Sequence, residues 1–164
     1  MGKGTDFRVE IPVETNIKRV QLTSGNQPIV PASLTLDGLS VLCIDNEPTI
    51  LDGLRILLGG WSCAVFCAGS LDGLETFLAN SSRPPDAIIA DYHLDDGNGI
   101  EAILKIRQHW RDNIPAVLVT ADRSLDVRNK AEEHSISIFN KPLKPAALRA
   151  FLNQIAIARK SAAE

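Results

Sequence analysis

The sequence AIIADYHLDDGNG, residues 87–99, decides the fold of this chain. Its first four residues are apolar and include two β-branched side chains, which is typical of a strand buried on both faces. The run ends at Asp91, and an acidic loop that contains glycine follows it. Open α/β folds bind their ligands beyond the carboxyl ends of their strands, so we interpret Asp91 as the reactive residue of the chain.

Length and composition set limits on the class of protein. The chain has 164 residues, 45% of them hydrophobic, and a net charge of −3, which fits one domain plus a tail and predicts no nucleic-acid partner. No apolar run is long enough to span a membrane, and the first residues lack the apolar region of a signal peptide. Cys43, Cys63 and Cys67 show neither a disulfide framework nor a zinc spacing, so we expect small buried thiols in a cytoplasmic protein without direct membrane contact.

Strand and helix patterns alternate from Leu39 onward. Short apolar runs predict strands at residues 41–44, 63–66, 87–90, 115–120 and 136–139. A helical pattern follows each strand; four helices start near Pro48, Ser70, Gly99 and Pro145, and Asp122 or Ser124 caps the other. This alternation predicts an α/β fold with a five-stranded parallel sheet flanked by five helices. Right-handed crossovers and the size favour the flavodoxin-like strand order 2-1-3-4-5.

The first predicted helix carries more apolar residues than one face needs. Ile50, Leu54, Leu57 and Leu58 recur at helical spacing, and we interpret them as the buried face. Ile56 then lies almost opposite that face, and Leu51 lies at its margin. An apolar side chain on the outer face of a helix is a candidate for contact with a partner.

Polar residues leave several strands at the same predicted edge of the sheet. Residues 45–47, Asp-Asn-Glu, follow the first strand, and Asp91 ends the third. Thr120 ends the fourth strand, and Lys141 follows the fifth. Oxygen ligands, a hydroxyl group and one ammonium group around a single carboxylate suit Mg²⁺-assisted phosphoryl chemistry.

These segments resemble the receiver domain of two-component response regulators. The resemblance covers residues 39–160 and rests on four motifs in order: CIDNEP at 43–48, DYHLDDGNG at 91–99, TA at 120–121 and KP at 141–142. It implies a phosphorelay protein that accepts a phosphoryl group from phosphohistidine. The implied partners are the phosphotransfer helices of a histidine kinase or a histidine phosphotransfer protein.

The resemblance also implies a role for each site residue. Asp91 would be the phosphoacceptor nucleophile. The cofactor would be Mg²⁺, held by Asp91, Asp45, the Asn46 side chain and the backbone carbonyl of His93, whose imidazole we expect to be solvated.

Two further residues would contact the phosphoryl group. Thr120 would donate a hydrogen bond to a phosphoryl oxygen. Lys141 would pair first with Asp91 and then with the phosphate, in a position fixed by Pro142, which we expect to follow a cis bond. The domain would thus assist its own phosphorylation and dephosphorylation. Ile56, with Leu51, would contact the histidine donor, because this helix docks on the donor in receivers.

The sequence departs from the family pattern at three positions. Asn46 replaces an acid, which removes one negative charge and should weaken Mg²⁺ binding. Asp95 replaces the proline of the phosphoacceptor motif, which should loosen that loop. Ile138 stands where the family has an aromatic residue, and Phe139 is one place out of register, so strand alternation points it to the other face.

The first residues suggest a longer parent protein. Residues 2–12, GKGTDFRVEIP, resemble the last strand of the ATP-binding domain of sensor histidine kinases. Residues 1–13 are therefore interpreted as a remnant of that domain, residues 14–38 as a linker, residues 39–160 as the receiver and residues 161–164 as a tail. The implied parent is a hybrid histidine kinase that can be anchored in a membrane.

Two other functions remain open at this point. The same fold can serve as a module that is never phosphorylated and regulates its kinase by contact, which Asn46 and Ile138 favour slightly. An unrelated flavodoxin-like enzyme or nucleotide binder is the third possibility. No glycine-rich phosphate loop follows the first strand, which argues against that third possibility.

Overall fold

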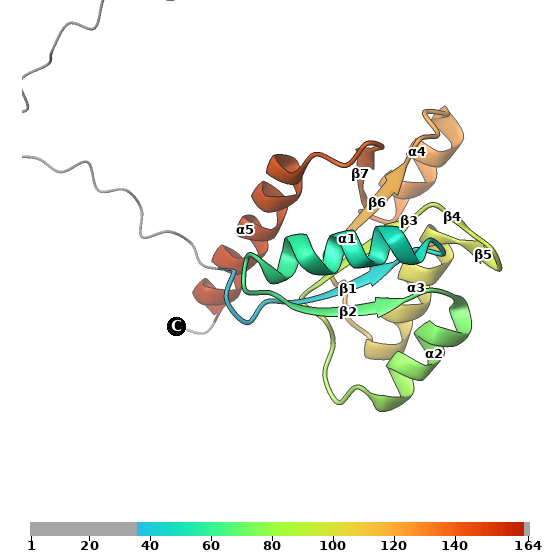
Figure 1. Cartoon of the computed structure of the whole chain (residues 1–164). Helices are drawn as coiled ribbons and strands as arrows, with labels where there is room; N and C mark the ends of the chain where they lie inside the picture. The colour runs from blue at the N-terminus through green and yellow to red at the C-terminus, as the bar shows by residue number, and fades with distance from the viewer. Residues whose placement is uncertain (1–35, 163–164) are drawn as a thin grey trace, which may run out of the picture. The chain divides into compact units, whose positions relative to one another are not determined.

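The structure is a computed structural model, and it describes residues 36–162 (Figure 1). Its main sheet has five parallel strands in the order β2-β1-β3-β6-β7. Because β4 and β5 form a separate hairpin, β6 and β7 are the fourth and fifth strands of the main sheet, and the predicted order 2-1-3-4-5 is confirmed. These strands are β1 (Ser40–Ile44), β2 (Ala64–Ala68), β3 (Ala87–Asp91), β6 (Ala116–Thr120) and β7 (Ser137–Asn140). The helices are α1 (Pro48–Gly59), α2 (Leu71–Asn80), α3 (Gly99–Trp110), α4 (Leu125–Glu133) and α5 (Pro145–Ala162).

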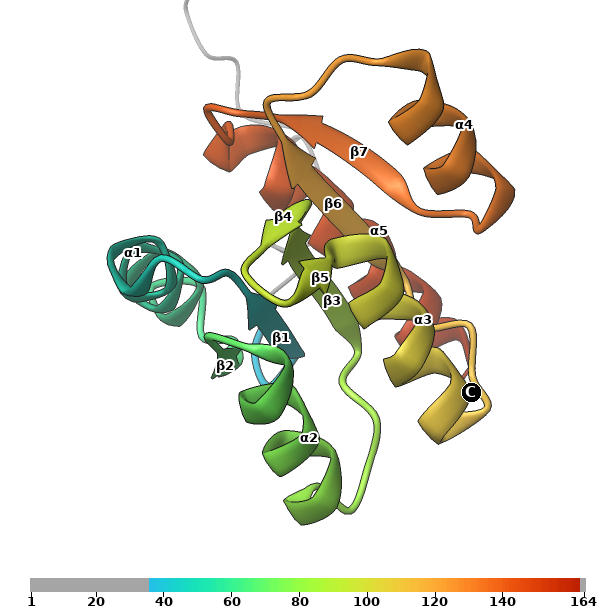
Figure 2. The ribbon, with the colours of Figure 1, turned by 90° about the vertical axis from the view of Figure 1, so that its right-hand side faces the viewer.

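Helices cover both faces of the sheet (Figures 1 and 2). Buried residues of α1 and α5 pack on one face, and buried residues of α2, α3 and α4 pack on the other. The central strand β3 contributes to both layers: Ile88 and Ala90 face one, and Ala87 and Ile89 face the other. Burial of both faces explains why this strand has a continuous apolar sequence.

Local sequence signals set the helix starts. The hydroxyl groups of Ser70 and Ser124 accept hydrogen bonds from the main-chain amides of Gly73 and Val127, which caps α2 and α4. Asn98 caps α3 in the same way. Ser124, rather than Asp122, is therefore the cap of α4.

The buried face of α1 differs from the predicted one at two positions. Leu51, Leu54 and Leu58 are buried, whereas Ile50 is 40% exposed. The predicted placement of Ile50 in the core and of Leu51 at a margin open to a partner is wrong. Both residues fit a helical repeat, but the rotation of α1 about its own axis turns Leu51, and not Ile50, toward the sheet. Ile56 is 78% exposed, as predicted.

A small hairpin was not predicted from the sequence. β4 (His93–Leu94) pairs antiparallel with β5 (Gly97–Asn98), and Asp95 and Asp96 form the turn. In this loop, where we expected Asp95 to replace a stiffening proline, the main chain of β4 and β5 is paired and the Asp95 side chain accepts a hydrogen bond. Strands of two residues are too short to give an alternating pattern.

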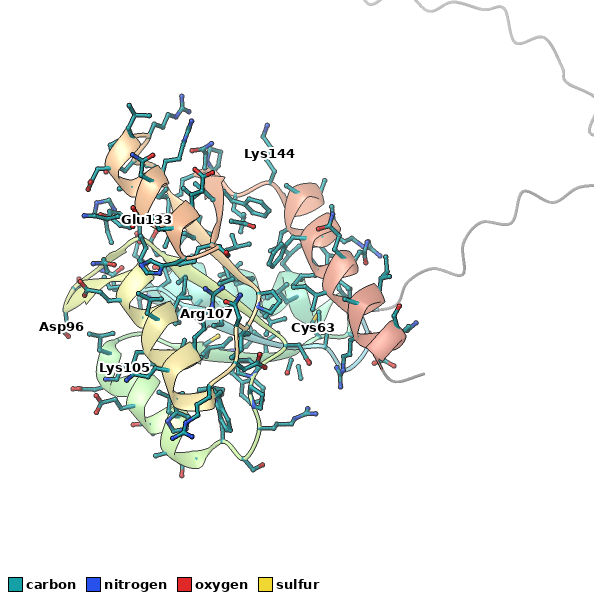
Figure 3. All side chains as sticks on the ribbon, turned by 180° about the vertical axis from the view of Figure 1, so that it is seen from behind. Cys63, Asp96, Lys105, Arg107, Glu133 and Lys144 are labelled. Carbon is teal, nitrogen blue, oxygen red and sulfur yellow. The ribbon has the colours of Figure 1, made fainter. Side chains whose placement is uncertain are left out.

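One arginine ties α3 to the neighbouring connections. The Arg107 guanidinium, labelled in Figure 3, donates hydrogen bonds to the main-chain oxygens of Ile114, His134 and Ser135. Burial lowers the pKa of Arg107. The side chain therefore satisfies one main-chain carbonyl just before β6 and two carbonyls that follow the end of α4.

The two ends of the fold lie at the edge opposite the strand carboxyl ends. Oδ2 of Asp86 accepts hydrogen bonds from the main-chain amide and hydroxyl group of Ser40 and from Arg159 of α5. Leu36, only 2% exposed, lines a shallow cavity with Arg159.

The folded part therefore includes residues that we assigned to the linker, and α5 extends into the predicted tail. The predicted kinase remnant at residues 1–13 and the linker up to residue 35 fall outside the described residues. Within residues 36–162, none of the helices combines the length and the hydrophobicity needed to cross a membrane.

Candidate functional site

The carboxyl ends of β1, β3, β6 and β7 meet at one edge of the sheet, beside the β4–β5 hairpin (Figure 2). Asp45 follows β1, Asp91 ends β3, Thr120 ends β6 and Lys141 follows β7. The structure therefore brings together the residues that the sequence assigned to one site.

Asp91 and Lys141 form the central ion pair of this edge. Nζ of Lys141 lies 2.9 Å from Oδ1 of Asp91, which is only 5% exposed. Burial alone would lower the pKa of Lys141, but its pairing with Asp91 and the charge of Asp45 outweigh that effect and raise the pKa. The ammonium group therefore stays charged at neutral pH.

The main chain fixes the position of Lys141. Its amide donates a 2.9 Å hydrogen bond to the carbonyl of Thr120, and the peptide bond from Lys141 to Pro142 is cis, as expected from the sequence. Lys141 is thus tied to the end of β6 by its main chain and to the end of β3 by its side chain.

Asp45 is a second buried carboxylate. It is 4% exposed, and its Oδ1 accepts a 2.8 Å hydrogen bond from the main-chain amide of Glu47. Burial raises the pKa of Asp45, and the nearby charge of Asp91 adds to the rise. Two buried carboxylates therefore share one ammonium group, which leaves excess negative charge at the edge.

The side chain of Asn46 makes a hydrogen bond with a residue far away in the sequence. Its Nδ2 donates a 2.6 Å hydrogen bond to Oδ1 of Asp95, at the turn of the hairpin. Two of the three positions at which this chain departs from the family pattern, Asn46 and Asp95, are therefore direct partners.

Thr120 and His93 complete the set of predicted residues. Thr120 is fully buried, and its Oγ1 accepts a 3.0 Å hydrogen bond from the amide of Asp122, which leaves the hydroxyl hydrogen available to another acceptor. The imidazole of His93 is exposed, as predicted.

Gly99 allows the first turn of α3 to lie close to the end of β3. A Cβ atom at this position would lie 2.2 Å from the main-chain oxygen of Asp91 and 2.8 Å from Cδ1 of Leu118. No side chain fits in that space, so glycine is required for the first turn of α3 to touch the end of β3.

The residues at this edge fit a hard divalent cation. The buried Oδ1 of Asp91 contacts the Lys141 ammonium at 2.9 Å and has no other hydrogen-bond donor among the described residues. Within residues 36–162, no three His, Cys, Asp or Glu side chains gather closely enough to hold a metal by themselves. A cation would therefore need amide and carbonyl oxygens in addition to Asp45 and Asp91, as Mg²⁺ accepts.

A mostly apolar cavity and an open groove lie near the site. A cavity of about 210 Å³ beside Asp91 and Lys141 is lined mostly by apolar atoms, including those of Ile50 and Leu54. Ile138 of β7 lines an open groove of about 670 Å³ against α4, whereas Phe139 packs with Phe151 in the layer of α1 and α5. Ile138 and Phe139 therefore face opposite sides of the sheet, as strand alternation predicted.

Comparison with known proteins identifies the family. Residues 41–153 match the family described as "Response regulator receiver domain". The chain belongs to this family. Receiver domains are parts of two-component systems, carry an aspartate phosphoacceptor, generally bind Mg²⁺ at the acidic pocket and interact with histidine kinases or phosphotransfer proteins.

Curated relatives of this receiver domain are longer proteins. The chain is 28% identical over 148 residues to the autoinducer 2 sensor kinase/phosphatase LuxQ of Vibrio parahaemolyticus, covering 90% of this chain and 17% of that protein. It is 33% identical over 124 residues to the KDP operon transcriptional regulatory protein KdpE of Escherichia coli, covering 75% of this chain and 53% of that protein. This chain therefore spans less than two thirds of either relative.

Solved structures agree with the fold. The signal receiver domain of an HD domain-containing protein from Pseudomonas fluorescens matches with a TM-score of 0.66 and 26% identity, covering 76% of this chain and 98% of that chain. The chemotaxis protein CheY4 of Vibrio cholerae matches with a TM-score of 0.62 and 19% identity, covering 72% of this chain and 98% of that chain.

Proposed function

We propose that this receiver domain accepts a phosphoryl group from phosphohistidine onto Asp91. The observation that carries the proposal is the buried Asp91 carboxylate paired with Lys141 at 2.9 Å, beside a second buried carboxylate. In the transfer, an Asp91 oxygen attacks the phosphorus, the phosphorus–nitrogen bond breaks, and an acyl phosphate forms. The electron pair of the broken bond stays on the imidazole nitrogen of the donor.

Residues around Asp91 position and stabilise the phosphoryl group. The ammonium group of Lys141 is free to move from the carboxylate to a phosphoryl oxygen, and the Thr120 hydroxyl donates to a second oxygen. Asp45, Asp91, the Asn46 side chain and the His93 carbonyl would hold Mg²⁺. Bound Mg²⁺ would offset the charge of the transferring group and of the two carboxylates.

We also propose that the parent protein is a hybrid sensor histidine kinase. The match to the sensor kinase LuxQ spans 90% of this chain, so it extends into the first 35 residues. Independently of that match, residues 2–12 resemble the end of a kinase ATP-binding domain. The donor would then be the phosphohistidine of a kinase or of a phosphotransfer protein, and Ile56 on the outer face of α1 would contact it.

A contact module that is never phosphorylated is the competing function. Asn46 and Ile138 favour it, because both depart from the residues of phosphorylated receivers. Incubation with acetyl phosphate, with and without Mg²⁺, separates the two functions when intact mass is measured. We expect a mass gain of one phosphoryl group that requires Mg²⁺ and is absent in Asp91→Asn. A wild-type protein whose mass does not change under any condition would support the contact module.

A further inference from the structure

Asp95 stands where the receiver family has a proline, and the family resemblance assigns it no role at this site. It lies 49 positions after Asn46, on the turn of the β4–β5 hairpin, and accepts the 2.6 Å hydrogen bond from Nδ2 of Asn46. The contact brings a negative charge next to the one position of the acidic cluster that lacks one.

The hydrogen bond also selects one orientation of the Asn46 amide. An amide has one end that donates and one that accepts, and only Oδ1 can bind a cation. Because Nδ2 donates to Asp95, Oδ1 is the end of the amide that is left to bind a cation. A carboxylate at position 46 would need no such partner, since both of its oxygens can bind a cation.

We propose that Asp95 is a positioning residue for the divalent cation at this site, and that it restores the charge lost at Asn46. This inference rests on the proposed Mg²⁺ site. Asp95 orients the amide so that Oδ1 can bind the cation, and it supplies a carboxylate one hydrogen bond away from the Asn46 ligand. The hairpin turn thus takes over part of the task that two adjacent acids after β1 perform in other receivers.

Calorimetric titration with Mg²⁺, which needs no phosphodonor, tests the inference. Removing a hydrogen-bond partner of a ligand typically weakens metal binding about tenfold or more, so we expect Asp95→Asn to raise the Mg²⁺ dissociation constant by about tenfold. Asp96→Asn is the matched control, because Asp96 lies at the exposed tip of the same hairpin (Figure 3) and makes no hydrogen bond to Asn46. We expect a much smaller change in this control.

Measuring Asp95→Asn in a second variant, Asn46→Asp, tests whether Asp95 acts through the Asn46 amide. In Asn46→Asp, which we expect to bind Mg²⁺ more tightly than wild type, Asp95→Asn should cost less affinity than it costs in wild type. An equal cost in both backgrounds, or equal effects of Asp95→Asn and Asp96→Asn, would overturn the role of Asp95 and leave the Mg²⁺ site intact. Absence of Mg²⁺ binding in wild type and in Asn46→Asp would overturn the proposed metal site itself.

Discussion

Lys141 connects two strand ends at the same time: its Nζ lies 2.9 Å from Oδ1 of Asp91, and its main-chain amide donates to the carbonyl of Thr120. Lys141 follows β7 and Asp91 ends β3, and β6 lies between these two strands in the sheet. The end of β6 therefore helps to position the lysine that neutralises the buried carboxylate. A change at Lys141 should affect the chemistry of Asp91 more than the fold.

We expect Lys141→Gln to slow acyl phosphate formation from acetyl phosphate by about 100-fold, because one preorganised charge at the phosphoryl group is lost. Lys141 is partly exposed, so we expect the free energy of unfolding to fall by only about 1 kcal/mol. Intact mass and urea unfolding measure the two effects. Lys144→Gln, at an exposed lysine labelled in Figure 3, is the control and should change neither. Unchanged phosphorylation of Lys141→Gln would contradict the assigned role.

Asp45→Asn should stabilise the metal-free protein while it weakens Mg²⁺ binding. The buried Asp45 carboxylate is near Asp91, and the amide removes that repulsion while it keeps an acceptor for the Glu47 main-chain amide. We expect the free energy of unfolding in EDTA to rise by about 1 kcal/mol. Urea unfolding in EDTA measures it, and Asp37→Asn, at an exposed carboxylate, is the control. A less stable Asp45→Asn protein would contradict the prediction.

Gly99→Ala should destabilise the domain by about 3 kcal/mol, because the new Cβ would lie 2.2 Å from the main-chain oxygen of Asp91 and the main chain has to move. Gly53→Ala provides the comparison. Nothing lies within 4 Å of a Cβ at that position of α1, so we expect a gain of about 0.5–1 kcal/mol. Urea unfolding measures both. Equal effects of the two changes would show that α3 does not approach β3 as closely as described.

Ile56→Glu should reduce the rate of phosphotransfer from a phosphorylated histidine donor by about tenfold and leave phosphorylation by acetyl phosphate unchanged. The side chain is 78% exposed on α1, so its replacement should not disturb the core. Leu125→Glu is matched to it, because Leu125 is 72% exposed on α4. Timed transfer from the donor, followed by gel or mass, compares the variants. If the two variants transfer at the same rate, α1 does not make the proposed contact.

Cys67 should be the first cysteine to react with iodoacetamide. A hydrogen bond from Cys43, together with the charge of Arg55, lowers the pKa of Cys67 to about 6. The thiolate is the reactive form, so the rate should rise with pH through about 6 and then level off. Cys43 and Cys63 are buried with raised pKa values and should react slowly. Peptide mass measures each site, and Arg55→Gln should move the midpoint upward; a midpoint unaffected by Arg55→Gln would contradict this cause.

The sequence was sufficient for the strand order and for most helix starts, because strand length, helical spacing and capping residues are local signals. It was not sufficient for the rotation of α1. Ile50 and Leu51 both fit a helical repeat, and only contact with the sheet selects Leu51.

In the site, too, some residues could be predicted from the sequence and others could not. Asp45, Asp91, Thr120 and Lys141 could be predicted because each stands at a strand end, where parallel topology brings them together. Asp95 could not be predicted as a partner of Asn46, because 49 residues separate the two and no spacing rule connects them. Only the hairpin places that carboxylate beside the amide.

The cluster of Ser40, Asp86 and Arg159 has a consequence for how this domain can be built into larger proteins. It holds the beginning of β1 and the last turns of α5 at the edge of the sheet away from Asp91. Polypeptide attached at either end of the fold therefore starts about one strand length from the acidic edge. Different segments can therefore be fused to either end of this domain without starting at the acidic edge.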